Sequence, residues 1–292
     1  SILPGTWGLE AGQSAVGDIF NWFVQKIQPR EGSHEALTAE ARRLAPGESG
    51  LLALDWHNGN RNVLGDQRLT GLLMGMTLDT RPAEVYRALV EACAMGARTI
   101  MERFEECGSQ VDRVVACGGI AVKNPMVMQI YADVTGRKIE LARSDQACAL
   151  GAAMAGSVVA GAEAGGHADF ASAAEAMTGV RDTRYEPDAD ASETYDKLYG
   201  LYRRLHDIFG TQDYAENQFG LMKELLAIRD EVRGKERPGS SASPEKSARY
   251  AIAVPRASQG SEWMSRERRQ CVPGHRRLTR GRTLPSPGIP RG

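Results

Sequence analysis

The stretch Cys117-Gly118-Gly119-Ile120-Ala121-Val122-Lys123-Asn124-Pro125 joins a predicted strand over 111–117 to a predicted helix over 124–135. Two adjacent glycines let the backbone turn sharply and approach a ligand without a Cβ in the way. Asn124 suits the N-cap of the helix, and Pro125 suits its first turn. Free amides at such a helix start favour an anion or a polar ring edge. An ordinary strand-to-helix turn carries the same residue types, so the stretch alone leaves its role open.

Helical and strand patterns alternate around this stretch, as they do in α/β domains. The pattern therefore predicts a mixed α/β domain over residues 1–235. A helix after Thr80-Arg81-Pro82 is expected to start with Thr80 as its cap and to stop at Gly108. A helix of small residues over 147–162 is expected to pack closely against a sheet. The other expected elements are a helix over 13–27, strands over 51–54 and 138–141, and helices over 195–209 and 213–233.

The last part of the chain, residues 236–292, has a different composition. It holds 12 Lys and Arg against 4 Asp and Glu, a formal charge of +8. Because the whole chain has a formal charge of −1, residues 1–235 carry about −9. Pro, Gly and Ser supply 21 of its 57 residues, and Leu, Ile, Val and Phe only 6. Such a segment buries too little apolar surface to offset its ordering entropy, so we expect a disordered basic tail or an out-of-frame extension. Nucleic-acid binding by its arginines is the less favoured alternative, and the acidic main body has no nucleic-acid surface.

The five cysteines, Cys93, Cys107, Cys117, Cys148 and Cys271, are widely spaced and form no CxxC pair. This spacing excludes the usual metal and redox motifs and predicts buried structural thiols in a reducing cytoplasm. No apolar run is long enough to span a membrane, and the chain starts at Ser1 without a signal segment. We therefore expect a cytoplasmic fragment with no membrane partner.

Two further polar segments are candidates for a site. The first is Leu9-Glu10-Ala11-Gly12-Gln13-Ser14-Ala15-Val16-Gly17-Asp18, in which glycines permit close approach near a helix start. The second is Leu54-Asp55-Trp56-His57-Asn58-Gly59-Asn60-Arg61, whose Asn-Gly pair also suits a surface turn. His57 has no partnered nucleophile nearby, so a hydrogen-bonded structural role is expected. The sequence has no GxxxxGK[ST] motif, and any ATP is therefore bound without a P-loop.

The stretch Gly71-Leu72-Leu73-Met74-Gly75-Met76, a spacer of seven residues and Glu84-Val85-Tyr86-Arg87-Ala88-Leu89-Val90-Glu91 resembles the second signature of the FGGY carbohydrate kinases. With the three segments above, the resemblance covers about residues 1–233. It implies an actin-like fold of two ribonuclease-H-type domains with ATP between them. This chain would supply the second domain, a mixed sheet flanked by helices.

The resemblance also implies residue roles, carried over one position at a time. Gly118 and Gly119 match the glycines against the adenosine, and Asn124 matches the polar residue that contacts adenine. Gly17 and Asn21 match positions that line the nucleotide in related kinases. Glu10 matches a contact to sugar hydroxyls, and a carboxylate is suited to accept such hydrogen bonds.

Within the family, the segments around Glu10, around His57 and over 128–136 look most like kinases of L-ribulose. The implied reaction transfers the γ-phosphoryl of ATP to the C5 hydroxyl of L-ribulose in arabinose catabolism, with Mg²⁺ held through the phosphates. The proton-accepting aspartate and the phosphate loops would lie before Ser1. Asp18, Asp55 and Asp66 stand in the wrong motifs, so no catalytic residue is assigned.

The expected partners are therefore a ketopentose and a missing N-terminal kinase domain, without which no turnover is expected. Two alternatives stay open: a kinase of another pentulose or polyol such as xylulose, and a non-catalytic nucleotide-binding or interaction module. The sequence also leaves a homodimer open.

Overall fold

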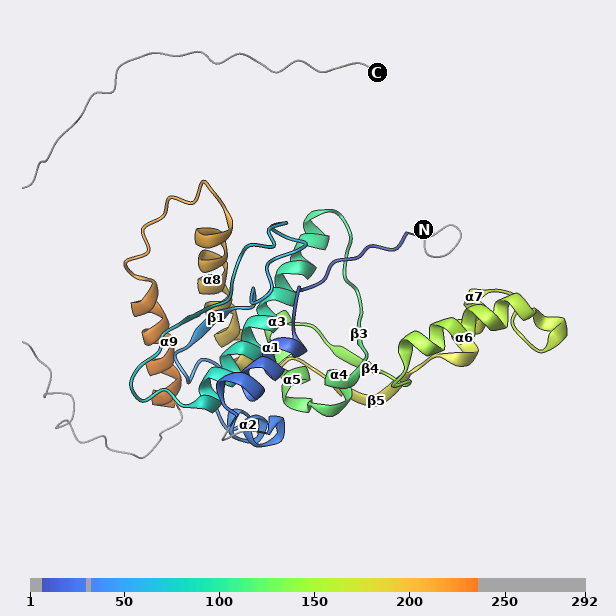
Figure 1. Ribbon diagram of the computed structural model, residues 1–292, viewed down its shortest axis with the longest axis horizontal. Helices are drawn as coiled ribbons and strands as arrows, with labels where there is room; N and C mark the ends of the chain where they lie inside the picture. The colour runs from blue at the N-terminus through green and yellow to red at the C-terminus, as the bar shows by residue number, and fades with distance from the viewer. Residues whose placement is uncertain (1–6, 30–32, 236–292) are drawn as a thin grey trace, which may run out of the picture. The chain divides into compact units, whose positions relative to one another are not determined.

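The computed structural model of the chain describes residues 7–29 and 33–235 (Figure 1). The predicted tail over 236–292 and Cys271 lie outside the described residues. The elements follow in the order α1 (Gly17–Trp22), η1 (Phe23–Ile27), α2 (His34–Ala41), β1 (Leu52–Leu54), β2 (Leu72–Met74), α3 (Pro82–Glu106), β3 (Val114–Ala116), α4 (Gly119–Lys123), α5 (Pro125–Thr135), β4 (Ile139–Ala142), α6 (Ala147–Ala160), η2 (Ala162–Ala164), α7 (Phe170–Met177), β5 (Val180–Tyr185), α8 (Ala189–Gly210) and α9 (Leu221–Lys235).

The 25-residue helix α3 carries the largest share of the core, and α2, α5, α8 and β1 all contact it. Its predicted extent is confirmed, but the predicted cap is wrong. The cap is Arg81, whose backbone N–H donates to Glu84 Oε2 at 2.7 Å. The Thr80 hydroxyl instead accepts from the Thr77 N–H at 2.8 Å. Pro82 favours this outcome because it makes the preceding residue extended, the conformation that a cap needs.

A buried polar network ties α3 to two neighbours. Arg87 Nε donates to Glu91 Oε1 at 2.7 Å, and its Nη2 donates to the Tyr195 hydroxyl of α8 at 2.9 Å. Its Nη1 donates to the carbonyl of Ala41 at the end of α2, at 3.0 Å. The Tyr195 hydroxyl in turn donates to Glu91 Oε1 at 2.9 Å. One guanidinium therefore joins three helices.

The strands form two sheets, where one mixed sheet was predicted. In the first, β1 and β2 pair antiparallel, with Leu52 opposite Met74. The second is mixed and has the order β3-β4-β5, with β4 in the middle (Figure 1). There β3 and β4 run parallel, and β5 runs antiparallel to β4. The strand predicted over 111–117 is present as β3, but its predicted length and burial are wrong, because β3 has three residues and Val115 is 43% exposed.

Helix boundaries differ from the prediction at several ends. The first helix starts at Gly17 rather than at residue 13, and Gln13 lies in the preceding segment, where its side chain donates to Asp55. The last helix starts at Leu221, and residues 213–218 have no regular structure. The stop at Gly136 is confirmed: this glycine has φ +63°, a left-handed conformation that ends a helix.

The small-residue helix α6 contacts α7 rather than a sheet, and none of its residues is buried. The cysteine prediction is confirmed for Cys93 alone among the described residues. Cys107, Cys117 and Cys148 are exposed, because the first two lie at element ends and the third lies on the uncovered α6.

Candidate functional site

The Gly-Gly turn after β3 is an open surface of the domain. Gly118 has φ +89°, a conformation that an L side chain rarely adopts, so this position favours glycine. A Cβ added at Gly118 or at Gly119 would meet no atom within 4 Å. The turn leads into the short helix α4, which the sequence did not predict. Both glycines therefore present bare backbone to the outside, where a flat ligand can lie against them.

Asn124 separates α4 from α5 and caps the second of them, as predicted. Its Oδ1 accepts from the Val127 N–H at 3.2 Å, and its Nδ2 donates to Thr38 Oγ1 on α2, also at 3.2 Å. Thr38 and the Tyr86 hydroxyl lie 3.5 Å apart, at the limit of a hydrogen bond. These contacts hold the half-buried amide of Asn124 in one orientation at the start of α5.

Helix α1 contacts the side chain of Ile120, the residue that follows the Gly-Gly turn. A Cβ at Gly17 would come within 3.0 Å of Ile120 Cδ1, so the absence of a side chain there permits the close approach of α1 and α4. Asn21 is exposed one turn further along α1. The structure therefore brings Gly17 next to Ile120, which follows Gly118 and Gly119, although about 100 residues separate them along the chain.

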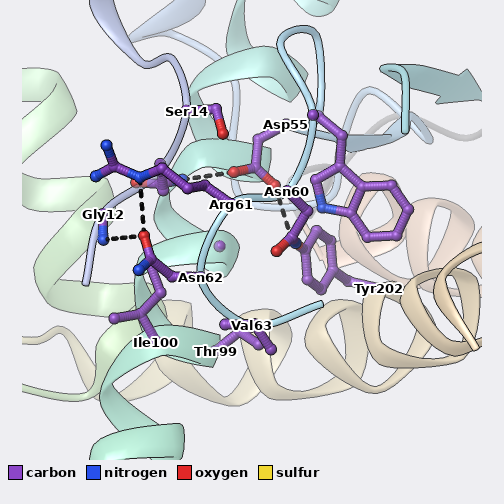
Figure 2. Close-up of a pocket in the computed structure, with 14 residues that line it drawn as sticks. Gly12, Ser14, Asp55, Asn60, Arg61, Asn62, Val63, Thr99, Ile100 and Tyr202 are labelled. Carbon is purple, nitrogen blue, oxygen red and sulfur yellow. Dashed lines mark hydrogen bonds between the residues drawn. The ribbon is translucent and has the colours of Figure 1, made fainter. Parts of the chain in front are cut away.

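Glu10 lies on a different part of this surface, in the extended segment before α1. Its side chain is 88% exposed and pairs with Arg61, with 3.7 Å between Oε1 and Nη2. The neighbouring Asn62 accepts from the backbone N–H of Gly12 at 2.9 Å and from Arg61 Nε at 3.1 Å (Figure 2). The structure thus joins the first and second polar segments of the sequence. Asn62 was missed because it follows the predicted segment.

A buried carboxylate anchors the two segments from below. The Asp55 oxygens accept from Gln13 Nε2 at 2.6 Å and from the Tyr202 hydroxyl of α8 at 2.8 Å (Figure 2). Burial raises the pKa of the Asp55 carboxyl, and the hydrogen bonds from Gln13 and Tyr202 oppose the rise. No spacing in the sequence reveals the partner 147 residues away.

The cavity beside Asp55 is small, about 20 Å³, which is room for about one water molecule. Ser14 Oγ and Trp56 Nε1 belong to lining residues of this cavity and have no hydrogen-bond partner within the described residues. Their polarity suits a bound water, and the volume is too small for a sugar. The side chain of Asp55 is buried and hydrogen-bonded to Gln13, so it joins the two polar segments.

His57 differs from its predicted hydrogen-bonded role. Its Nδ1 has no partner within residues 7–29 and 33–235, and its ring packs on Trp22 with 5.1 Å between centroids. The ring also lies where a Cβ of Gly71 would be, 2.5 Å from Cε1. Burial lowers the pKa of His57 and so favours the neutral ring. A hollow of about 400 Å³ opens beside it, between α1 and the segment of Asn58.

No helix of the described ranges is long and apolar enough to cross a membrane. In the same ranges no group of three or more His, Cys, Asp or Glu side chains is arranged to hold a metal ion.

Comparison with known proteins gives a consistent result. Residues 1–160 match the model of the FGGY family of carbohydrate kinases, C-terminal domain. The ribulokinase of Geobacillus thermodenitrificans is 51% identical over 242 residues, which are 80% of this chain and 42% of that protein. The ribulokinase of Halalkalibacterium halodurans is 49% identical over 238 residues, 78% of this chain and 41% of that protein.

Two solved structures share the fold. The xylulose kinase of Rhodospirillum rubrum has a TM-score of 0.56 at 26% identity over 68% of this chain and 40% of that chain. The xylulose kinase of Lactobacillus acidophilus has a TM-score of 0.57 at 22% identity over 66% of this chain and 38% of that chain. This chain spans about two fifths of the length of the curated relatives it matches.

Proposed function

The chain belongs to the FGGY family of carbohydrate kinases and contains their C-terminal domain, and on this premise we propose that it is the nucleotide-binding half of an ATP-dependent L-ribulose kinase. The observation that supports the nucleotide half of the proposal is the contact of α1 with Ile120, the residue after the Gly-Gly turn, with 3.0 Å from a Gly17 Cβ to Ile120 Cδ1. This contact brings together the two segments that contain most of the positions that the family resemblance assigns to the nucleotide. The ribulokinase relatives at about half identity support L-ribulose over D-xylulose.

In this proposal the adenosine of ATP lies against the bare backbone of Gly118 and Gly119. Asn124 presents its amide at the start of α5, held in place by Thr38. Gly17 and Asn21 line the other side. The open surface at the two glycines fits a flat ring, because a Cβ at either position would project into free space and so into a ligand.

The sugar is proposed to lie near Glu10, whose carboxylate accepts hydrogen bonds from its hydroxyls. Arg61 pairs with Glu10 and limits the positions that this exposed side chain adopts. The C5 hydroxyl oxygen of L-ribulose forms a bond to the γ-phosphorus while the bond from that phosphorus to the β-bridging oxygen breaks, and ADP leaves. ATP supplies the phosphoryl group, and Mg²⁺ bound through its phosphates would supply charge neutralisation.

The hydroxyl proton needs an acceptor, and we propose that the preceding part of the kinase supplies it. Asp55 is unsuitable because it is buried and both of its oxygens already accept hydrogen bonds. Asp18 and Asp66 are exposed and lie in segments that the family does not use for this step. The purified chain by itself is therefore expected to bind ADP weakly and to produce none from ATP and L-ribulose.

Titration of the purified chain with ADP tests the nucleotide site. Gly119→Ala should weaken ADP binding about tenfold, because its Cβ occupies the space of the ligand. Gly200→Ala, an exposed position in α8 with open space around it, is the matched control and should leave binding unchanged. Equal affinities for the two variants, or no binding by the unmodified chain at millimolar ADP, would contradict the proposal.

A second experiment tests the substrate. The part of the Geobacillus thermodenitrificans ribulokinase that precedes the matched region is fused ahead of Ser1, and ADP release is measured with L-ribulose and with D-xylulose. L-Ribulose should be the better substrate. A preference for D-xylulose would contradict the assignment of L-ribulose as the substrate. The proposed nucleotide site would be unaffected, because the ADP titration tests it separately.

A further inference from the structure

Three hydrogen bonds tie the segment before α1 to the loop that follows β1. Residues 7–16 form no helix or strand, so no backbone ladder fixes them. Instead, three consecutive residues of this segment each contact a side chain of the loop over 55–62. The contacts are Gly12 N–H to Asn62 Oδ1 at 2.9 Å, Gln13 Nε2 to Asp55 Oδ2 at 2.6 Å, and Asn58 Nδ2 to the Ser14 carbonyl at 3.2 Å. The loop therefore determines where the chain near Glu10 lies.

Asn62 joins this segment to an exposed arginine. Its Oδ1 accepts from the Gly12 N–H and also from Arg61 Nε at 3.1 Å (Figure 2). The guanidinium lies close to the backbone of Gly12, since a Cβ there would be only 3.0 Å from Arg61 Nη2. The same Nη2 is 3.7 Å from Glu10 Oε1. One amide oxygen thus fixes both the arginine and the backbone two residues after Glu10.

The ion pair between Glu10 and Arg61 depends on this support. Their side chains are 88% and 52% exposed. A pair so exposed gains little free energy, because water screens the charges and because ordering two long side chains costs entropy. The hydrogen bonds of Asn62 remove part of that entropy cost before any ligand arrives. The position of the guanidinium beside the carboxylate is therefore set by Asn62.

Glu10 and Arg61 offer complementary hydrogen-bonding groups. A carboxylate only accepts hydrogen bonds and a guanidinium only donates them, whereas a hydroxyl does both. Within residues 7–29 and 33–235, only Nε of Arg61 donates a hydrogen bond, so both Nη groups keep their donors for a ligand. Two neighbouring hydroxyls of a sugar can bind such a pair together, one donating to Glu10 and the other accepting from Arg61.

We propose that Arg61 is a second sugar-binding residue and that Asn62 is the positioning residue that holds it beside Glu10. The ligand is a pair of neighbouring hydroxyls on an uncharged ketopentose. The C3 and C4 hydroxyls of L-ribulose are such a pair, and their binding leaves the reacting C5 hydroxyl free. The inference rests on the proposed function in one respect, that the sugar lies near Glu10.

Hydrogen exchange in the full chain tests the role of Asn62. Asn62→Ala should speed exchange of the Gly12 amide by about tenfold, because it removes the acceptor. Asn62→Asp keeps an acceptor oxygen and should keep this exchange slow. Asn217→Ala is the matched control, since Asn217 is also exposed and accepts one local hydrogen bond, from the Phe219 N–H at 2.9 Å. Equal exchange at Gly12 in Asn62→Ala and in the wild type would overturn the proposal.

Kinetics of the chain fused to the preceding part of the Geobacillus thermodenitrificans ribulokinase test the role of Arg61. Arg61→Met keeps an apolar stem and removes the donors, so KM for L-ribulose should rise about tenfold. The kcat and the KM for ATP should stay within about twofold, because a contact away from the C5 oxygen binds substrate and transition state alike. Asn62→Ala should raise KM for L-ribulose in the same way, and Asn62→Asp should restore it. A fall in kcat with unchanged KM for L-ribulose would indicate a structural role and overturn the proposal.

The remaining outcomes separate this proposal from the proposed function. A fused chain that phosphorylates L-ribulose with equal KM in Arg61→Met and in the wild type overturns the second sugar contact alone. Phosphorylation of D-xylulose instead contradicts the assignment of L-ribulose. A rise of KM for D-xylulose in Arg61→Met would then still support the contact, because D-xylulose has hydroxyls on the same two carbons. A fused chain that phosphorylates neither sugar contradicts the proposed function, and the sugar contact is overturned with it.

Discussion

Replacement of Arg87 by methionine should destabilise the domain strongly, because it removes the cation from a buried pair. Arg87 and Glu91 are 5% and 2% exposed, and Arg87 donates three hydrogen bonds of 2.7, 3.0 and 2.9 Å. Methionine fills much of the space of the arginine stem but leaves the Glu91 carboxylate buried without a cation. Breaking a buried ion pair in this way costs about 3–5 kcal/mol. That is a large share of the roughly 5–15 kcal/mol that stabilises a typical domain.

The measurement is urea unfolding of the full chain, followed by far-ultraviolet circular dichroism at pH 7. Arg103→Met on the same helix is the matched control, because Arg103 pairs with Glu106 at 2.9 Å and both side chains are more than half exposed. An exposed pair contributes about 0–1 kcal/mol, so this variant should unfold almost as the wild type does. Adding Glu91→Gln to Arg87→Met should recover part of the loss, because the buried charge is then gone. A loss below about 1 kcal/mol for Arg87→Met would refute the reasoning.

Two further predictions concern the anchor around Asp55. Gly96→Ala should cost about 1–3 kcal/mol of unfolding free energy, since its Cβ would lie 2.5 Å from Asp55 Oδ2 and 2.6 Å from Gln13 Nε2. Gly200→Ala has open space and should be neutral or stabilising in the same urea experiment; similar values for both would contradict the packing argument. Burial raises the pKa of Asp55, so the folded chain keeps a proton that the unfolded chain has lost. The contribution of Asp55 to stability is therefore greatest below the unfolded pKa of about 3.9 and falls as the pH rises through the folded pKa. Wild-type stability relative to Asp55→Asn should fall as the pH is raised from about 4.5 to 8, and a constant difference would contradict the assignment.

Local signals in the sequence predicted much of the fold. The start of α5 at Asn124-Pro125 and its end at Gly136 are confirmed, because a cap, a first-turn proline and a left-handed glycine each act within one helix turn. The cap of α3 was wrong for a related reason. Thr80 and Arg81 are both near the start, and the conformation that Pro82 imposes on Arg81, together with the hydrogen bond from the Arg81 N–H to Glu84, decides between them.

Long-range pairings were not predictable from spacing. The family resemblance implied a single mixed sheet, and the described residues form two sheets, since the pairing of strands depends on contacts between distant segments. Tyr202 lies in the helix predicted over 195–209, and nothing in that pattern indicates that its hydroxyl donates to a carboxylate 147 residues earlier. The exposure of α6 was also unpredictable, because an apolar sequence indicates burial but does not say which surface buries it.

The contact between Gly17 and Ile120 could be predicted in part. Resemblance to a family placed both segments near the nucleotide, and the roles of Gly17, Asn21, Gly118, Gly119, Asn124 and Glu10 stay predictions. The folded structure is needed to show that a Cβ at Gly17 would lie 3.0 Å from Ile120 Cδ1. The spacing of residues along the chain does not predict such a contact between α1 and α4.

The bond between Asp55 and Tyr202 has a consequence for the order in which the domain forms during synthesis. Ribosomes add about 5–20 residues per second, so Asp55 emerges roughly 7–30 s before its partner 147 residues later. During that interval Gln13 is the only one of its two side-chain donors that has been made. The loop that carries Asp55 can therefore reach its final state only after α8 has left the exit tunnel. A nascent chain halted before Tyr202 should remain open at this loop and accessible to chaperones or proteases.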